Sequence, residues 1–438
     1  MVYSAEAKFK APPVAVPFTL FPQNILECPN VPGGAPLCVP VAAGRLRKTP
    51  RELSMDFAFS DEQQAIRDTA RRFASEHLAP SYRKREAEGV IGTAVTLGMG
   101  ELGLIGTDLP EEYGGLGLDC VTTGIIIEEI AAADLNVSYV QLMGSLNGKI
   151  LAEHAKPELA SKVIGDLCAG KILTGLGLTE PRGGSDAAGL ALRARKDGED
   201  YILDGEKTSI SLSTQADSVL LFARTGTDEE RSRGISAFYA PLNEPGVTRT
   251  SFDDMGSGAV GRGSLFFDEV RIPGDYILGA EGAGFRQVMS GFDFSRGLIG
   301  LMVLGPARQS MEEAWQYTTE REAFGNPIAS YQGVTQPLAE CATYLEAATT
   351  LCYKTLWLRD NGLPHTKEAA MVKWWAPKVA FDIIHQCLLT HGHYGYTKEL
   401  PLEQRMRDVL GLQIGDGTAQ IQKMIIARET VGRVALPY

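Results

Sequence analysis

Apolar residues begin to recur with helical spacing near residue 60. Ser60 and Gln63 have the spacing of a capping box, in which each side chain bonds the backbone N–H of the other residue. The apolar residues that follow share one helical face: Ile66, Ala70, Phe73 and Ala74. We therefore predict a helix that begins after Ser60, and helical patterns continue to about residue 170.

The period of the pattern changes to two between about residues 172 and 275, which is typical of strands. The predicted strands cover residues 172–178, 190–194, 201–203, 219–223, 235–240 and 265–270. Helical patterns then return and predict helices over residues 284–321, 333–360, 366–390 and 402–434. Pro306 lies inside the first of these helices, so we expect a kink there.

The order of helices, then strands, then helices predicts an α+β fold. Strands and helices do not alternate, which excludes a Rossmann domain. The expected parts are an N-terminal helical domain over residues 55–171, a central β domain over residues 172–283 and a helical bundle over residues 284–438.

Residues 1–54 differ from the rest of the chain. They hold nine of the 23 prolines and show no periodicity, so we expect a disordered Pro-rich extension and a natural start at Met55. A targeting segment stays open as an alternative, because four basic residues cluster there: Arg45, Arg47, Lys48 and Arg51.

Composition narrows the classes of function. The net charge of −12 argues against non-specific binding of nucleic acid. No apolar run approaches the roughly 18 residues of a membrane span. The seven cysteines form no Cys-x-x-Cys pair and the six histidines lack metal-ligand spacing. We therefore expect no metal site and a reducing, cytoplasmic location.

Asp416 is the first candidate for chemistry, because it lies between Gly415 and Gly417 just before a helix-forming stretch. Glycine on both sides lets the backbone approach a ligand closely. The start of the next helix offers unpaired N–H groups. This arrangement suits a carboxylate that is presented to a substrate. Taken alone, the segment leaves open that Asp416 is only an N-cap.

The second candidate is the run Leu-Thr-Glu-Pro-Arg-Gly-Gly-Ser-Asp at residues 178–186. Two glycines before Ser185 expose backbone N–H groups that suit an anion, and Thr179 and Ser185 add hydroxyls. A purely structural turn is the alternative. The run resembles the flavin-binding signature of acyl-CoA dehydrogenases, in which Thr-Glu-Pro and two variable residues precede Gly-Ser-Asp.

Five further segments resemble the same family, in the family's order. Residues 204–211 resemble the family's second flavin-contacting strand, and residues 293–296 resemble its acyl-CoA site. Residues 321–332 resemble the segment that reaches the flavin of a neighbouring subunit, and residues 391–396 resemble a degraded form of the family's Gly-Gly flavin turn. Residues 406–408 precede Asp416 at the family's spacing. With six motifs in order between residues 57 and 433, the chain is identified as a member of the acyl-CoA dehydrogenase family.

The resemblance implies the family's fold, which has an N-terminal helical domain, a central β domain and a C-terminal four-helix bundle. It also implies FAD as the cofactor, an acyl-CoA substrate, electron-transfer flavoprotein as the acceptor and a homotetramer. The implied reaction is α,β-desaturation, in which a carboxylate removes the α-proton and the β-hydrogen leaves as a hydride to the flavin.

Residue roles follow from the resemblance, position by position. Asp416 stands where the family has its glutamate base, while Ser295, where a second branch has its base, carries no carboxylate. The implied flavin contacts are Leu178, Thr179, Gly184, Ser185, Ser209, Ser211, Arg321, Phe324, Gln332, Gly392, Thr418 and Gln420. The implied acyl-CoA contacts are Ser185, Asp293, Arg296 and Gly417.

Two residues depart from the family pattern. Asp416 is one methylene shorter than glutamate, and a substrate with a ring at its α-carbon would close the gap. The aspartate at residue 416, together with residues 207–211 and 392–396, resembles the pattern of cyclohexanecarboxyl-CoA dehydrogenases. A short- or branched-chain acyl-CoA dehydrogenase and a nitroalkane-oxidase-like flavin oxidase stay open, as does a non-catalytic relative. Ser209 replaces a tryptophan and opens the flavin edge toward the electron acceptor.

Overall fold

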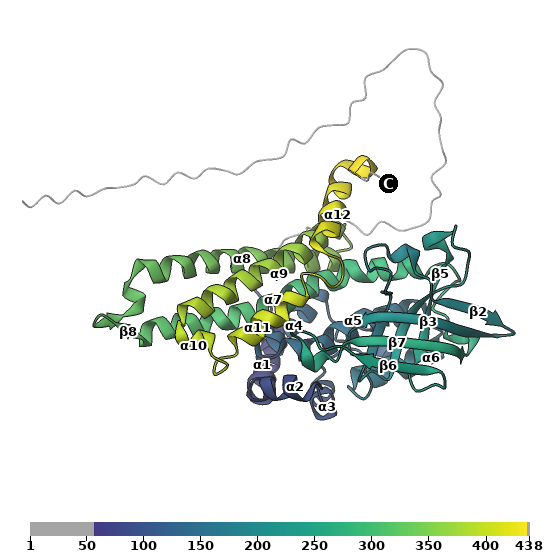
Figure 1. The fold of residues 1–438 in the computed structure, drawn as a ribbon, viewed down its shortest axis with the longest axis horizontal. Coiled ribbons are helices and arrows are strands. Elements are labelled where there is room, and N and C mark those ends of the chain that lie inside the picture. Colours follow the sequence, from purple (N-terminus) through teal and green to yellow (C-terminus); the bar gives the residue numbers. More distant parts are fainter. Residues whose placement is uncertain (1–56, 436–438) are drawn as a thin grey trace, which may run out of the picture. The chain divides into compact units, whose positions relative to one another are not determined.

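The computed structural model describes residues 57–435, and its elements follow the order of helices, strands and helices (Figure 1). This order confirms the predicted α+β fold. The extension expected over residues 1–54, its alternative as a targeting segment and the start at Met55 lie outside the described residues.

The first part of the fold is helical. Its α-helices are α1 (Asp61–Phe73), α2 (Tyr82–Glu88), α3 (Thr93–Glu101), α4 (Cys120–Ala133), α5 (Leu135–His154) and α6 (Pro157–Cys168). The predicted capping box is confirmed, because Ser60 Oγ accepts from Gln63 N at 3.2 Å and Gln63 Oε1 accepts from Ser60 N at 3.1 Å. Helix α5 is buried along most of its length, since it packs against α4, α6, the long helix α7 and strand β1.

The second part is a mixed seven-stranded sheet with the order β1-β4-β2-β3-β7-β6, in which β5 pairs with β4. The strands are β1 (Thr174–Gly177), β2 (Arg193–Asp197), β3 (Asp200–Ile210), β4 (Ser218–Arg224), β5 (Ile235–Pro241), β6 (Val247–Ser251) and β7 (Gly263–Ile272). Strand β4 runs parallel to β1 and β2, and the other pairs are antiparallel. The sequence pattern does not predict β6, because this edge strand buries no side chain and so lacks an apolar face.

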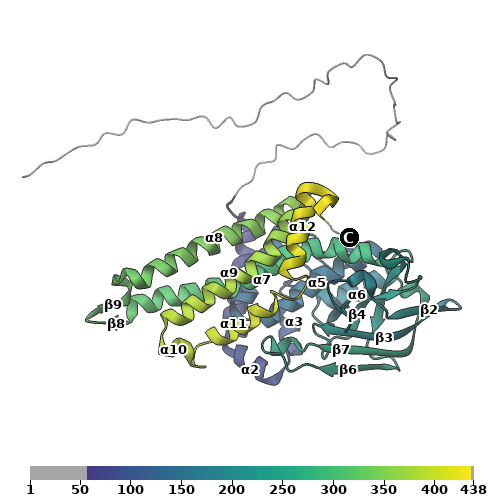
Figure 2. The ribbon, with the colours of Figure 1, turned by 45° about the horizontal axis from the view of Figure 1, so that its top comes forward.

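The third part is a helical bundle. It contains α7 (Gly284–Glu320), α8 (Gln332–Asp360), α9 (Thr366–Thr390), the short α10 (His393–Tyr396), α11 (Leu402–Gly411) and α12 (Ala419–Val431). A small hairpin of β8 (Glu322–Ala323) and β9 (Asn326–Pro327) connects α7 to α8. Helices α7, α8 and α9 lie side by side (Figures 1 and 2). Helix α7 continues through Pro306, and the expected kink stays a prediction.

The prediction of one continuous helix over residues 402–434 is wrong. Helix α11 ends at Gly411 and α12 begins at Ala419, so a turn separates them. Within this turn Asp416 and Gly417 have φ values of +52° and +97°, which an α-helix does not allow. The apolar period continues on both sides of the break, and the local signal for it is the Gly-Asp-Gly run at residues 415–417.

Of the described helices, α7 is long and apolar enough to cross a bilayer by length and composition. However, 78% of its most apolar stretch is buried inside the fold, as in the core helix of a globular protein.

A buried carboxylate joins the three parts of the fold. Asp408 on α11 is fully buried and accepts hydrogen bonds from Tyr82 Oη of α2 at 2.6 Å, Asn136 Nδ2 of α5 at 2.9 Å and Ser257 N, which precedes β7, at 2.6 Å. Burial raises the pKa of Asp408 to about 7 against the effect of these donors. The start of the turn that carries Asp416 is therefore positioned by contacts to all three parts.

The raised pKa of Asp408 predicts a specific pH dependence of stability. The folded protein keeps a proton on Asp408 up to about pH 7, whereas an aspartate in the unfolded chain titrates near about 3.9. The contribution of this proton to the free energy of unfolding is complete below about pH 4 and is lost as the pH rises through about 7. We expect Asp408→Asn to show a smaller change in the urea midpoint between about pH 5 and about pH 8 than the wild type.

The control for this experiment is Asp382→Asn, at an exposed carboxylate on α9, which should keep the wild-type slope of midpoint against pH. Parallel curves for the wild type and Asp408→Asn would contradict the prediction.

Candidate functional site

The turn after β1 is stabilised from inside by a buried ion pair. Lys207 of β3 is fully buried and donates from Nζ to Glu180 Oε1 at 2.8 Å and to the Leu178 carbonyl at 3.1 Å. The Glu180 carboxylate also accepts from Ala191 N at 2.6 Å and Leu192 N at 2.8 Å. Burial would raise the pKa of Glu180, but Lys207 and these N–H groups bring it below its ordinary value. Burial lowers the pKa of Lys207 to about 8.

The outer side of the same turn carries free donors. Gly183, Gly184 and Ser185 are exposed, and the backbone N–H groups of Gly184 and Ser185 donate no hydrogen bond within residues 57–435. A cavity of about 190 Å³ lies between this turn and residues 186–190. Gly183 of this turn lines the cavity, whereas Gly184 and Ser185 do not. The free N–H groups and the hydroxyl on the outer side of the turn suit an anionic, polar ligand such as the phosphates of a nucleotide cofactor.

Ser209 and Ser211 lie beside this turn, because Thr208 N donates to the Thr179 carbonyl at 2.9 Å. The pairing of β3 with β7 shifts register between Lys207 and Ile210, so Ser209 lies in an irregular stretch of strand. Its φ is +58° and its side chain is exposed, while Ser211 is half-buried. Bulges of this kind redirect side chains next to active sites, and the sequence pattern gave no signal of this one.

Asp416 is not the N-cap of α12. Thr418 has that role, since its side chain accepts from Ile421 N, and the alternative that this segment left open is therefore wrong. Gln422, fully buried on α12, donates from Nε2 to the carbonyls of Asp416 and Gly417, each at 3.2 Å. Gly417 has a φ of +97°, which residues with a side chain rarely adopt, and a Cβ atom there would lie 2.4 Å from Gln422 Nε2 and displace it. Asp416 as a residue is partly exposed.

Two cations lie near Asp416. Burial raises the pKa of this carboxyl, and Lys373 of α9 and Arg296 of α7 act in the opposite direction. Arg296 is buried and pairs with Asp293 Oδ1 at 3.0 Å, and Asp293 Oδ2 accepts from Thr366 Oγ1 at 2.7 Å. Arg296 Nε is buried and has no hydrogen-bond partner among the described residues. The structure thus pairs Arg296 with Asp293 and places its charge where it acts on Asp416.

Two residues near Asp416 were absent from the sequence prediction. Lys373 is fully buried on α9, and Tyr139 on α5 is 7% exposed. Burial raises the pKa of Tyr139, and the negative charge of Asp416 adds to the rise. A lysine among the apolar positions of α9 is a signal that could have identified Lys373. Tyr139 gives no such signal, because an aromatic residue on an apolar helix looks like ordinary core.

Four predicted flavin contacts lie at the opposite end of the bundle. Arg321, Phe324, Gln332 and Gly392 are exposed, and Figure 1 shows β8 and α10 at the end of the bundle that is distant from the sheet. Phe324 is 95% exposed with a φ of +51°. A single chain therefore does not bring these residues to the turn that contains Thr179. Of the remaining predicted contacts, Thr418 caps α12 and Gln420 is exposed in its first turn.

Backbone strain coincides with the predicted site. Among the described residues, seven that are not glycine have positive φ, and three of these are predicted site residues: Ser209, Phe324 and Asp416. Such conformations cost free energy and collect at functional sites.

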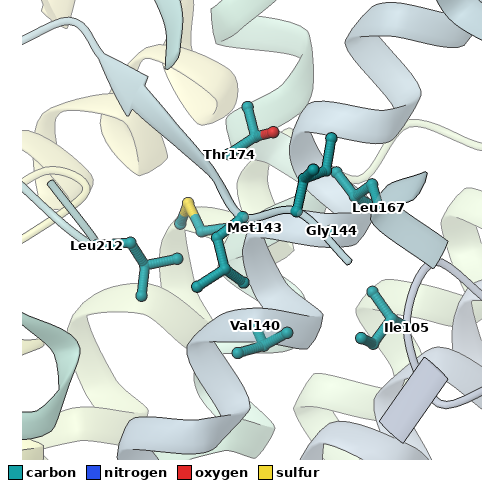
Figure 3. A pocket seen from close by; sticks show the side chains of 9 residues that line it. Ile105, Val140, Met143, Gly144, Leu167, Thr174 and Leu212 are labelled. Carbon is teal, nitrogen blue, oxygen red and sulfur yellow. The ribbon is translucent and has the colours of Figure 1, made fainter. Parts of the chain in front are cut away.

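A small apolar cavity between α5 and β1 is a separate feature (Figure 3). Val140, Met143 and Gly144 of α5 line it together with Thr174 and Leu212. Its volume of about 10 Å³ is no more than a single water molecule needs, so it is a packing defect and not a ligand site. The described residues also contain no group of three potential metal ligands, and the five described cysteines are free.

Comparison with known proteins assigns the family. The N-terminal, middle and C-terminal domain models of acyl-CoA dehydrogenases match residues 60–171, 175–270 and 282–431, which is more than half of the chain. The chain belongs to the acyl-CoA dehydrogenase family. This acyl-CoA dehydrogenase is therefore an FAD-dependent oxidoreductase that acts on CH–CH bonds, and the predicted fold of three parts is confirmed.

Three relatives illustrate the range of similarity. An acyl-CoA dehydrogenase of Bacillus subtilis is 35% identical over 85% of this chain and 99% of its own. Benzylmalonyl-CoA dehydrogenase of Aromatoleum aromaticum is 34% identical over 86% of this chain and 99% of its own. The structure of butyryl-CoA dehydrogenase from Megasphaera elsdenii has a TM-score of 0.83 and 31% identity, and the match covers 86% of this chain and 99% of that one.

Proposed function

We propose that this acyl-CoA dehydrogenase uses Asp416 as its base and desaturates an alicyclic acyl-CoA thioester, cyclohexanecarboxyl-CoA. The observation that carries the proposal is the environment of Asp416. The residue lies on a strained turn with only part of its surface exposed, burial raises the pKa of its carboxyl, and the two cations Lys373 and Arg296 oppose that rise.

These features suit proton abstraction next to a thioester. A raised pKa brings the carboxyl closer to the acidity of the α-proton, and the nearby cations keep enough of it ionised to accept that proton. FAD, when bound, would supply the hydride acceptor for the β-hydrogen of the acyl group. The Asp293–Arg296 pair and Gly417 would contact the acyl-CoA next to Asp416, and Ser185 would contact it from the turn after β1.

The flavin contacts are proposed in two groups. Leu178, Thr179, Gly184, Ser185, Ser209, Ser211, Thr418 and Gln420 would contact the flavin of their own chain. The free N–H groups of Gly184 and Ser185 support this assignment. Arg321, Phe324, Gln332 and Gly392 would contact the flavin of a neighbouring subunit, which is supported by their exposure at the distant end of the bundle.

The length of the acid supports the ring substrate. Aspartate leaves about one methylene of space between base and α-carbon, and unfilled space loses dispersion contacts and alignment. Relatives of similar identity have names that state a ring-bearing CoA ester, benzylmalonyl-CoA, and a straight-chain one, butyryl-CoA, so similarity does not choose between the two. A short- or branched-chain acyl-CoA dehydrogenase is therefore the second candidate function, and the butyryl-CoA relative is the observation behind it. We do not propose an oxidase, because the family match is to dehydrogenases.

We also propose a homotetramer, electron-transfer flavoprotein as the electron acceptor and a cytoplasmic location. The exposed Arg321 supports the homotetramer, because its guanidinium has no ion-pair partner among residues 57–435. Free thiols at the five described cysteines support a reducing compartment.

Asp416→Asn tests the base. The amide keeps the shape of the side chain, so FAD should bind as in the wild type. It cannot accept the α-proton, however. Anaerobic reduction of the flavin by acyl-CoA should become at least about 10³-fold slower, as measured by stopped-flow absorbance. Reduction at near wild-type rate would show that another group is the base.

The substrate is tested by comparing acyl-CoA esters. We expect kcat/KM for cyclohexanecarboxyl-CoA to exceed that for butyryl-CoA by at least about tenfold, because the ring fills the space beside Asp416. Asp416→Glu supplies the matched comparison, since the longer acid should reduce this ratio. A wild-type preference for butyryl-CoA would identify a straight-chain enzyme, and a preference for isobutyryl-CoA would keep α-branching but exclude the ring.

The oligomer is tested with Arg321→Ala. If Arg321 contacts the flavin phosphates of a neighbouring subunit, its loss should lower FAD occupancy and loosen the assembly together. The two readouts are the ratio of flavin to protein absorbance and the mass by light scattering. Arg72→Ala, at an exposed position of α1, is the control and should change neither. A monomer with full FAD occupancy would refute the proposal.

A further inference from the structure

Lys373 is a buried cation that none of the proposed contacts uses. It is fully buried on α9, between apolar neighbours on the same helix that are also buried, such as Val372 and Ala376. Removing an ammonium group from water is costly unless other groups compensate for it. No carboxylate lies within ion-pair distance of Lys373 among the described residues, so its compensation comes from elsewhere.

The acceptors of Lys373 are two backbone carbonyls, which lie on either side of Asp416. Lys373 Nζ donates to the carbonyl of Leu412 at 2.7 Å, and it lies 3.5 Å from the carbonyl of Gly417. Leu412 is the C-cap of α11, and Gly417 is the residue after Asp416. One ammonium group therefore contacts the turn at its beginning and close to its end.

A lysine that only capped α11 would contact the Leu412 carbonyl alone and would act on the helix dipole. Two observations indicate that the role of Lys373 is not limited to capping α11. Lys373 also approaches Gly417, and its positive charge acts on the Asp416 carboxyl. The other cation near Asp416, Arg296, is already paired with Asp293, which leaves Lys373 as the one without a carboxylate partner in this cluster.

We propose that Lys373 is a positioning residue for the reaction, because its ammonium group orders the turn that carries Asp416 and keeps that carboxylate ionised. The inference rests on the proposed role of Asp416 as the base. It assigns two separable effects to one side chain, a hydrogen-bonding effect on the turn and an electrostatic effect on the carboxyl.

The charged groups that act on Lys373 are Asp416 in the turn and Arg296 on α7. Burial lowers the pKa of Lys373 to about 8, so the group is cationic at neutral pH. Because this cation opposes the rise that burial causes in the pKa of Asp416, a neutral side chain at residue 373 should raise that pKa further.

Three variants of the FAD-loaded enzyme separate the two effects. Lys373→Met removes donor and charge, Lys373→Gln keeps a donor without the charge, and Lys378→Met makes the same change at an exposed lysine of α9 as the control. The first readout is amide hydrogen exchange over residues 411–422, which does not depend on turnover. The second is the pH profile of flavin reduction by acyl-CoA.

We expect Lys373→Met to exchange at least about tenfold faster over residues 411–422 than the wild type, with other segments unchanged. In the pH profile of flavin reduction, the acidic limb of this variant should shift to higher pH by about one unit. Lys373→Gln should move the limb by a similar amount but exchange more slowly than Lys373→Met. Lys378→Met should match the wild type in both measurements.

Wild-type exchange and a wild-type acidic limb in both Lys373 variants would overturn the inference. If Lys373→Met fails to fold, Lys373→Gln alone tests both effects. The acidic limb of its pH profile tests the electrostatic effect, and its amide hydrogen exchange over residues 411–422 tests the effect on the turn. The proposed function is judged separately by Asp416→Asn. If that variant reduces its flavin normally, the base is wrong, whereas loss of reduction there with unchanged Lys373 variants refutes only the role of Lys373.

Discussion

The position of the candidate base depends on a carboxylate that is buried one helix upstream. Asp408 accepts three hydrogen bonds, which come from α2, α5 and the segment before β7. These donors belong to the N-terminal helices and to the β part, while Asp408 itself lies in the bundle. Helix α11 therefore cannot shift without losing bonds to both other parts, and the turn after it begins from a defined point.

Two buried lysines stabilise the two turns of the candidate site in similar ways. Lys207 contacts the carbonyl of Leu178 and the carboxylate of Glu180 behind the turn after β1, and Lys373 contacts the carbonyls of Leu412 and Gly417 behind the turn that carries Asp416. In both cases the ammonium group lies on the protein side of the turn. The groups expected to contact ligand then remain on the other side, where Ser185 is exposed and Asp416 is partly exposed.

The predicted site residues are spread over distant parts of the fold. The turn after β1 and the irregular end of β3 lie at the sheet, whereas Phe324 and Arg321 lie at the far end of the bundle. An exposed aromatic residue with positive φ is costly for an isolated chain, both in apolar surface and in backbone strain. A second copy of the chain that covers Phe324 would remove its apolar surface from water, which is consistent with the proposed homotetramer.

The sequence by itself determined the order of the elements, the family and the segments that carry the candidate chemistry. Periodicity reports which face of an element is buried, and for this reason the capping box at Ser60, the strands with an apolar face and the long helices are predictable. The position of Asp416 between two glycines is likewise a local property, and its assignment as the base came from resemblance and stays a prediction.

Only the tertiary structure decided the exposed edge strand β6, the length of the break between α11 and α12 and the irregular backbone at Ser209. It also showed that Thr418, and not Asp416, caps α12, and that Lys373 lies behind the turn. These features arise from contacts between residues that are far apart in the chain. Lys373 and Leu412 meet only after α9 and α11 have packed, and no local pattern records the free energy of such a contact.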